Sequence, residues 1–376
     1  MKPSRISLFA AIMLVEFAAF EAGLRLKGGS EAAPAFQRLF MTDSRIGYRL
    51  RPGTETRFKT SEFETDIRIN AEGTRDNEIG PKAPNERRVV VLGDSIVMAI
   101  QVPLVQTFCK RLEDRLNADR LAGPYHYRVI NAGVQGYGPV EELLFYQHVV
   151  QRFDPDVVLV GLFVGNDAME GADSAPKLRE GRTPAARTRE NVGVWLRRIV
   201  RRSMVLQIIR LRAVGFLERL GKARPIDRAL TMYLPSTPPD MERGLGVTRE
   251  CVTSIAALAE QHGARTGIVL LPARFQVADD DYARLKEAVA ESGETLVRDA
   301  ATERFARALS GLPLPLMDAL PLLRNSPRRA ELFFQDTVHL TPLGHQVLAD
   351  GLERFLLESR LLEPASAAPV APANRR

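Results

Sequence analysis

Cysteine, histidine and tryptophan are scarce, since the 376-residue chain has two cysteines, five histidines and one tryptophan. Cys109 and Cys251 lie in separate apolar stretches and form no C-x-x-C pair. We expect two buried thiols, with a single disulfide as the alternative if the protein is exported. The histidines form no cluster of ligands, which argues against a structural zinc site. The fold therefore depends on a hydrophobic core, and the chain is long enough to bury one.

A strong excess of charge of one sign is also missing. The formal net charge is +6, hydrophobic residues make up 45% of the chain and charged residues 26%. This composition is typical of a globular chain and not of a disordered one. The positive surplus is mostly arginine between roughly residues 176 and 228, where we find no nucleic-acid-binding motif. We therefore expect no nucleic-acid partner.

One long apolar run stands at the N-terminus. It follows Lys2 and Arg5 and extends from about Ile6 to Leu24, which is long enough to span a bilayer as a helix. Basic residues ahead of such a run favour an N-terminus inside the cell, with the remaining chain outside. We expect residues 1–28 to be an uncleaved, single-pass anchor in the inner (cytoplasmic) membrane, with the following domain periplasmic or extracellular. A cleaved signal peptide is the alternative.

Beyond residue 85, apolar segments alternate with helical segments. Fully apolar segments are typical of parallel strands covered on both faces, and we expect such strands at 87–93, 127–133, 156–164 and 266–273. Amphipathic periodicity predicts helices at 105–119, 140–153, 247–263 and 344–361. In the first of these helices, one apolar face is formed by Val105, Phe108, Leu112 and Leu116. The alternation predicts a doubly wound α/β fold.

The stretch VVVLGDSIV, residues 89–97, places Ser95 directly after the first apolar strand. A serine is a weak nucleophile until a base takes its proton. In FFQDTVHLTPLGH, Asp336 and His339 are three residues apart, which in a helical turn would bring both side chains to one side. Asp336 could then accept from one imidazole nitrogen and leave the other for Ser95, as in a serine triad. The G-x-S-x-G elbow of α/β-hydrolases is absent.

Two further stretches follow predicted strands. NAGVQGYG contains Gly136, and VGNDA contains Asn166. Because the carboxyl ends of parallel strands line one edge of a sheet, we expect both residues to lie near Ser95. The backbone N–H groups of Ser95 and Gly136 and the amide of Asn166 would then be donors for the oxyanion of a tetrahedral intermediate.

In this order, the segments GDS, NAGVQG, GND and DTVH resemble the four sequence blocks of the SGNH/GDSL hydrolases. The stretches GYRLRPG and INAEGTRDNE resemble the membrane-anchored bacterial branch of that family. The resemblance implies a three-layer α/β/α sandwich around a parallel sheet, of the SGNH-hydrolase or flavodoxin-like kind. It also implies Ser95 as nucleophile, His339 as base, Asp336 as the acid that orients it, and an oxyanion hole of Ser95, Gly136 and Asn166. The mechanism needs no cofactor and no metal.

With this resemblance, the chain divides into four parts. They are a membrane anchor at 1–28, an extended lead-in packed on the core at 29–85, a catalytic domain at 86–362, and a disordered tail at 363–376. The catalytic domain carries a helical, Arg-rich insertion at about 171–240. Two interpretations of the insertion stay open, namely a cap or membrane-surface helix, and a packed helical insertion with solvated arginines.

Supporting roles are expected for several other residues. Met98 and Ala99 stand where many relatives have an aromatic residue and a glycine, and they are expected at the pocket floor. The remaining expectations are a turn at Gly133, a structural role for His345, loop bracing by Asp94 and Asp167, and either a cleft position or an ion pair for Arg75.

The sequence thus predicts a serine esterase that hydrolyses O-acyl esters, acetyl esters above all, on envelope glycans or lipids. One alternative is an O-acetyltransferase that acts on a polysaccharide. Another is a catalytically silent glycan-binding relative, which would follow if Met98 and Ala99 block the pocket. Activity is expected to rise at about pH 6–7 as His339 becomes neutral.

Overall fold

The computed structural model describes residues 36–118, 124–179 and 226–363. The expected anchor at 1–28, nearly all of the expected tail and most of the Arg-rich insertion lie outside these ranges. Within them, no helix is both long and apolar enough to cross a bilayer.

A five-stranded parallel sheet forms the centre of the described chain. Its order is β6-β5-β7-β8-β9, and its strands are β5 (Glu86–Gly93), β6 (His126–Gly133), β7 (Val157–Phe163), β8 (Arg265–Leu271) and β9 (Leu316–Asp318). The first strand of this sheet along the chain is thus flanked by the second and the third, as in flavodoxin-like folds. Such a reversal of strand order creates a crevice at the carboxyl ends of the strands, between β5 and β7.

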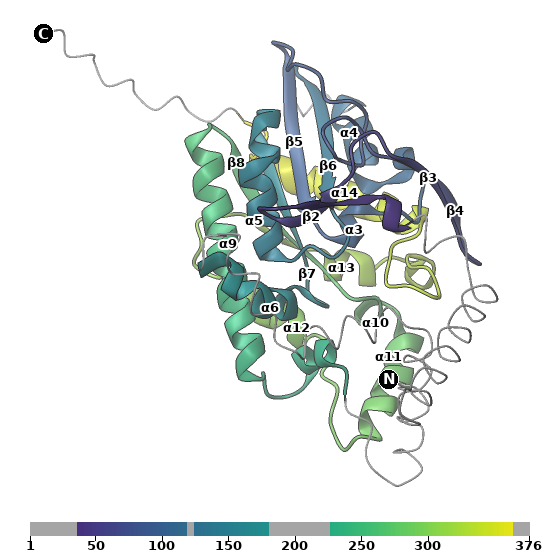
Figure 1. Cartoon of the computed structure of the whole chain (residues 1–376). Helices are drawn as coiled ribbons and strands as arrows, with labels where there is room; N and C mark the ends of the chain where they lie inside the picture. The colour runs from purple at the N-terminus through teal and green to yellow at the C-terminus, as the bar shows by residue number, and fades with distance from the viewer. Residues whose placement is uncertain (1–35, 119–123, 180–225, 364–376) are drawn as a thin grey trace, which may run out of the picture.

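Helices cover both faces of this sheet, which confirms the three-layer α/β/α fold (Figure 1). On one face, α4 (Phe108–Ala118) packs against β6 and against α14 (Pro342–Glu358). On the other face, α5 (Pro139–His148) packs against β5, α6 (Asp167–Arg179) and α9 (Pro239–Gln261). Other α-helices among the described residues are α3 (Ser95–Met98), α10 (Arg274–Val277), α11 (Asp279–Ala290), α12 (Ala300–Leu309) and α13 (Ala319–Arg324).

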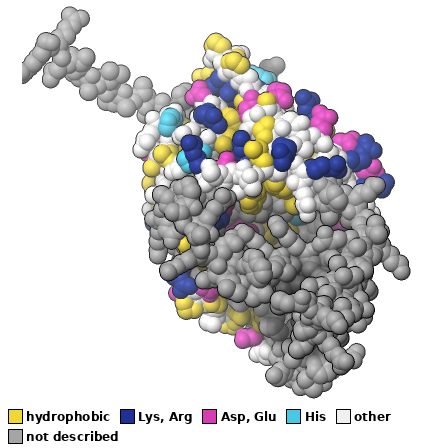
Figure 2. All heavy atoms as spheres, in the orientation of Figure 1, with side chains coloured by type: hydrophobic (Ala, Val, Ile, Leu, Met, Phe, Trp, Pro, Cys, Tyr) yellow, Lys and Arg dark blue, Asp and Glu magenta, His cyan; other side chains and the backbone are white. Residues whose placement is uncertain are grey.

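The lead-in forms two small antiparallel sheets. One pairs β1 (Phe40–Asp43) with β2 (Gly47–Leu50), and the other pairs β3 (Glu55–Lys59) with β4 (Glu64–Arg68). The second pair is a hairpin at the edge of the molecule, in which Thr65 and Ile67 of β4 are buried and the other residues of that strand are exposed (Figure 1). Charged side chains of both signs lie close together on the described surface (Figure 2), as Arg57 and Asp66 do on this hairpin at 2.7 Å. Exposed pairs of this kind contribute little to stability.

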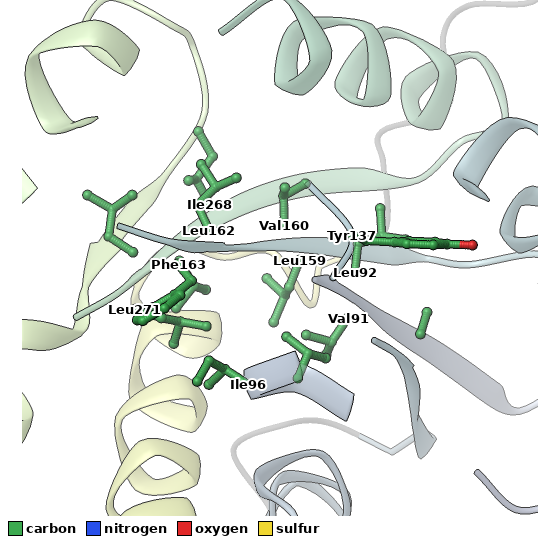
Figure 3. Close-up of a cluster of buried hydrophobic side chains, with 14 of the residues drawn as sticks. Val91, Leu92, Ile96, Tyr137, Leu159, Val160, Leu162, Phe163, Ile268 and Leu271 are labelled. Carbon is green, nitrogen blue, oxygen red and sulfur yellow. The ribbon is translucent and has the colours of Figure 1, made fainter. Parts of the chain in front are cut away.

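The core explains why the strands are apolar throughout. Side chains of a strand point alternately to the two faces, and both faces are buried, as Val160 and Leu159 of β7 show (Figure 3). One expectation is wrong at the edge of this core. Val105 does not continue the apolar face of α4, because it lies in a separate 3₁₀ turn, Leu104–Gln106, and is 71% exposed.

Candidate active site

The strand β5 delivers Ser95 to the carboxyl edge of the sheet. The chain turns sharply after Gly93, where a Cβ atom would lie 2.2 Å from the side chain of Val97. Asp94 then caps the short helix α3, because its carboxylate accepts a hydrogen bond from the backbone N–H of Ile96 at 2.8 Å. Ser95 is the first residue of that helix and is 8% exposed. The sequence G-D-S therefore builds a tight turn with the serine at its exit.

The strand β6 packs against this turn and α3. Gly133 is the last residue of β6, and a Cβ atom there would lie 2.3 Å from the backbone nitrogen of Met98. The expectation of a turn glycine was wrong, since the residue is needed for the close approach of α3. Met98 and Ala99 are 0% and 1% exposed. Met98 ends α3 and Ala99 follows it, and both are packed in the core and not on an open pocket floor.

Arg75 secures the segment that follows α3. It is 1% exposed, and its guanidinium donates to the carbonyl oxygens of Met98 at 2.8 Å, of Val102 at 2.6 Å and of Ala99. The two roles expected for Arg75, a cleft position and an ion pair, are therefore wrong. Arg75 instead donates to three backbone carbonyls. The adjacent Asp76 pairs with Lys110 at 2.7 Å.

The loop after β6 carries Gly136 in a left-handed conformation, with φ of +74°. A Cβ atom at this position would lie 3.0 Å from the hydroxyl of Tyr48. Tyr48 donates to the carbonyl oxygen of Gln135 at 2.9 Å. Its own carbonyl accepts from the Tyr137 hydroxyl at 2.6 Å. The sequence analysis missed Tyr48, although it lies in the GYRLRPG stretch that carried part of the resemblance.

The loop after β7 carries Asn166. Its Nδ2 donates to the carboxyl of Glu170 at 3.1 Å, and its Oδ1 is buried with no hydrogen-bond partner among the described residues. Asp167 braces the same loop, since its carboxyl accepts from the backbone N–H of Phe163 at 2.8 Å. Ser95, Gly136 and Asn166 thus follow three adjacent strands at the crevice of the sheet.

His339 and Asp336 lie in an irregular loop and not in a helical turn. The helix α14 begins only at Pro342, and Phe333 and Leu340 form an isolated antiparallel bridge at the base of the loop. Several backbone N–H groups of this loop bond to side chains. That of His339 donates to the hydroxyl of Thr337 at 3.3 Å, a local contact that competes with helix formation. Those of Gln335 and Asp336 donate to the carboxylate of Glu62 at 2.5 and 2.7 Å.

Asp336 is directed away from the imidazole. It is exposed, and its carboxylate accepts from the hydroxyl of Ser61 at 3.3 Å. Both ring nitrogens of His339 are buried without a hydrogen-bond partner in the described part of the chain. Burial lowers the pKa of His339 to about 4, so the ring is neutral at pH 7. The structure therefore does not form the expected Asp336–His339 hydrogen bond.

The loop nevertheless lies at the carboxyl edge of the sheet. Arg274, which follows β8 by three residues, donates to the carbonyl oxygen of Phe334 at 2.7 Å and pairs with Asp281 at 2.6 Å. Nearby, His345 has a structural role, because its Nδ1 accepts from the backbone N–H of Phe108 at 3.2 Å. Burial lowers the pKa of His345 to about 3, as this acceptor role requires.

Buried carboxyls lie behind the three loops. Burial raises the pKa of Asp94 to about 6, although hydrogen bonds from Ile96, Asn166 and Ser95 lower it. Burial and neighbouring carboxylates also raise the pKa values of Glu142, Asp167 and Glu170. Among the residues with described positions, no group of three or more potential ligands could hold a metal ion. Glu170 is thus held largely as a neutral acid at pH 7, whereas Asp94 is mostly ionised at that pH.

A model of the GDSL-like lipase/acylhydrolase family matches residues 91–293, which is more than half of the chain. The match includes Ser95, Gly136 and Asn166 and ends before Asp336 and His339. No curated protein matches the sequence.

Several solved structures are similar to the chain. A lipase/acylhydrolase from Enterococcus faecalis is 16% identical over 73% of this chain and 96% of its own, with a TM-score of 0.37. A catalytic mutant of an acetylxylan esterase from Geobacillus stearothermophilus is 14% identical over 73% and 96%, with a TM-score of 0.39. A psychrotrophic esterase from a Pseudoalteromonas species is 12% identical over 73% and 98%, with a TM-score of 0.38.

Proposed function

The chain belongs to the GDSL-like lipase/acylhydrolase family, and we propose that it is a serine esterase that hydrolyses small O-acyl esters with Ser95 as nucleophile. The observation that carries the proposal is the meeting of three loops at the crevice of the sheet. One loop presents a hydroxyl at a helix start, and the other two present Gly136 and the amide of Asn166. Acyl transfer needs a nucleophile and convergent donors in this arrangement.

In the proposed reaction, the Ser95 oxygen attacks the ester carbonyl carbon, and a ring nitrogen of His339 takes the hydroxyl proton. The carbonyl oxygen becomes an oxyanion that accepts from the backbone N–H groups of Ser95 and Gly136 and from Nδ2 of Asn166. The intermediate collapses, and the alcohol leaves with the proton from His339. Water then attacks the acyl-serine, again with His339 as base, and the acid is released.

His339 is suited to this role because neither ring nitrogen is occupied by another described residue. One nitrogen is available to Ser95 and the other to an orienting acid. Asp336 can take the second position only if its carboxylate leaves the hydroxyl of Ser61. We therefore assign Asp336 a role that requires the loop at 334–340 to rearrange when substrate binds.

We further propose acyl groups on envelope glycans or lipids as substrates, with acetyl esters preferred. The support is the apolar run at 6–24, which follows basic residues and would tether the enzyme at the outer face of the inner membrane. A panel of p-nitrophenyl esters of increasing chain length, together with acetylated sugars, tests this choice. Preference for long acyl chains over acetate would contradict it.

Labelling with a fluorophosphonate tests the nucleophile directly, because only an activated serine reacts. We expect stoichiometric labelling of the native protein at pH 7.5, with the adduct mapped to the Ser95 peptide by mass spectrometry. Protein unfolded in denaturant should not react. A native protein that remains unlabelled would show a silent relative, and a label on another serine would assign a different nucleophile.

Removal of the side-chain donor is a separate test. Asn166→Ala is expected to raise the activation barrier for aryl acetate hydrolysis by about 3 kcal/mol, which is roughly a hundredfold loss of kcat. The control is Asn85→Ala, an exposed position before β5, which should leave kcat unchanged. Equal kcat values for Asn166→Ala and the control would remove Asn166 from the oxyanion hole.

A further inference from the structure

We propose that Glu170 is a positioning residue for the oxyanion hole, because its carboxyl holds one amide hydrogen of Asn166 and thereby fixes the amide on the side of Asp94 and Ser95, where the second hydrogen can reach the oxyanion. The inference rests on the proposed function, since it takes Asn166 as a donor in ester hydrolysis. Glu170 itself does not touch the reacting atoms in this scheme. Its effect on the reaction passes through the orientation of the Asn166 amide.

The hydrogen bond between the two side chains carries the argument. An Asn amide has two N–H donors, and one of those of Asn166 is used by Oε1 of Glu170 at 3.1 Å. The Oδ1 atom of Asn166 is buried and has no partner among the described residues. The contact with Glu170 restrains rotation of the amide from the α6 side, and the hydrogen bond of Asn166 to the carboxylate of Asp94 restrains it from the Ser95 side. Because the two residues are four apart at the start of α6, the helix itself sets their separation.

The packing around Glu170 leaves it little freedom to move. A Cβ atom on Gly138 would lie 2.6 Å from Cβ of Glu170, so the carboxyl side chain occupies the space that a side chain at 138 would need. The Oε2 atom of Glu170 is buried without a described partner. In the neighbouring loop, which carries Gly136, the hydroxyl of Tyr48 donates to the carbonyl of Gln135 at 2.9 Å. Glu170 thus restrains the loop of Asn166, and Tyr48 restrains the loop of Gly136.

The acidic surroundings of Glu170 give it a pH dependence that can be measured and that a purely structural residue would not show. The groups that face it are acidic or neutral, namely Asp94 before α3, Glu141 and Glu142 of α5, Asp167 and Asp173 of α6, and Tyr48 of β2. Two cations pair with members of this group, Lys177 with Glu141 and Arg228 with Asp173. Burial, followed by the carboxylates of Asp94 and Glu141, raises the pKa of Glu170 to about 8.

Glu170 is therefore neutral at pH 7 and becomes an anion above about pH 8. A neutral acid can accept from Asn166 without opposing a nearby negative charge. An ionised Glu170 would repel the oxyanion that develops beside Asn166, and repulsion between like charges is strong in a buried site. We expect kcat/KM of the wild-type protein to fall as the pH rises above about 8, in addition to any change below neutrality.

The test compares Glu170→Gln, Glu170→Leu and the wild type over pH 6–10 with an aryl acetate. Glu170→Gln keeps an acceptor but cannot ionise, so it should hold kcat within about threefold of wild type at pH 7 and lose the alkaline fall. Glu170→Leu removes the acceptor and should lower kcat roughly 10- to 100-fold at pH 7, as expected for a misplaced group, with KM little changed. The matched control is Glu287→Gln on the exposed side of α11, which should keep the wild-type profile.

A double-mutant cycle separates positioning from general destabilisation. In an Asn166→Ala background, Glu170→Leu should cause no further loss of kcat, because the group that it positions is gone. An alkaline fall that persists in Glu170→Gln, or additive losses in the cycle, would overturn the inference while leaving the esterase intact. A wild-type protein that hydrolyses no ester and takes no fluorophosphonate would overturn both proposals. Thermal melting of each variant at pH 7 identifies any loss that comes from unfolding.

Discussion

Ser95→Ala is expected to lower kcat for a small aryl acetate by about 10⁴-fold or more, with little change in the melting temperature. The loss is large because hydroxyl, base and donors act as a unit, and the remaining donors supply only residual catalysis. The fold should persist because alanine is a good helix former at the start of α3. The cap of that helix is the carboxylate of Asp94, which the substitution leaves in place.

The control for this variant is Ser254→Ala on α9, whose hydroxyl donates to the carbonyl of Glu250 in its own helix at 2.9 Å. It should keep full activity and full fluorophosphonate labelling. If purified Ser95→Ala retained more than about one hundredth of wild-type kcat, after contaminating esterases had been excluded by labelling, Ser95 would not be the nucleophile. If it lost both activity and its cooperative melting transition, the result would report on folding, and Ser95→Cys with a thiol-reactive ester would then test the position.

The apolar strands followed from local features of the sequence. Runs such as VVVLG and VVLVGLF are apolar at every position because both faces of the sheet are covered. The alternation with helices then leaves few arrangements, and the parallel sheet and its layers were correctly predicted. The same reasoning predicted that Ser95, Gly136 and Asn166 lie at one edge of the sheet, because each stands within three residues of the end of a strand.

The loop with Asp336 and His339 was not predictable in the same way. Spacing alone suggested a helical turn, but the conformation depends on hydrogen bonds from residues far away in the chain. Ser61 contacts Asp336 across 275 positions, and Glu62 binds two N–H groups of the same loop. No local periodicity encodes such contacts. The i, i+4 relation of Asn166 and Glu170, in contrast, was readable from the sequence and was overlooked.

The lead-in at 36–85 contributes to the site through three separate contacts. Tyr48 binds the loop of Gly136, Glu62 binds the loop of His339, and Arg75 binds the carbonyls that follow α3. Each contact comes from a different part of the lead-in, and each reaches a different loop of the site. The lead-in therefore acts as a frame for the catalytic loops, which its extended sequence pattern did not indicate.

His339→Ala is expected to lower kcat by about 10⁴-fold, similar to Ser95→Ala, because no other described histidine lies in a loop at the carboxyl edge of the sheet. His345 cannot replace it, since its Nδ1 already accepts from the N–H of Phe108. The pH dependence is the sharper part of this prediction. Burial lowers the pKa of His339 to about 4, so the base form persists well below neutrality. We expect kcat/KM to change little between pH 7 and pH 5, in place of the rise at pH 6–7 that an ordinary imidazole would give.

Ring ¹⁵N spectra can measure this titration directly, since the chain has only five histidines and His339→Ala identifies one signal. A midpoint near 4 would show that His339 has no carboxylate partner before substrate binds, and Asp336→Asn should then leave the midpoint unchanged. A midpoint at 6–7 that falls in Asp336→Asn would contradict the described loop. In that case Asp336 would already be paired with His339, because an adjacent carboxylate favours the charged imidazole and raises its pKa. The position of this single midpoint therefore decides whether the triad is assembled in the free enzyme or only when the ester arrives.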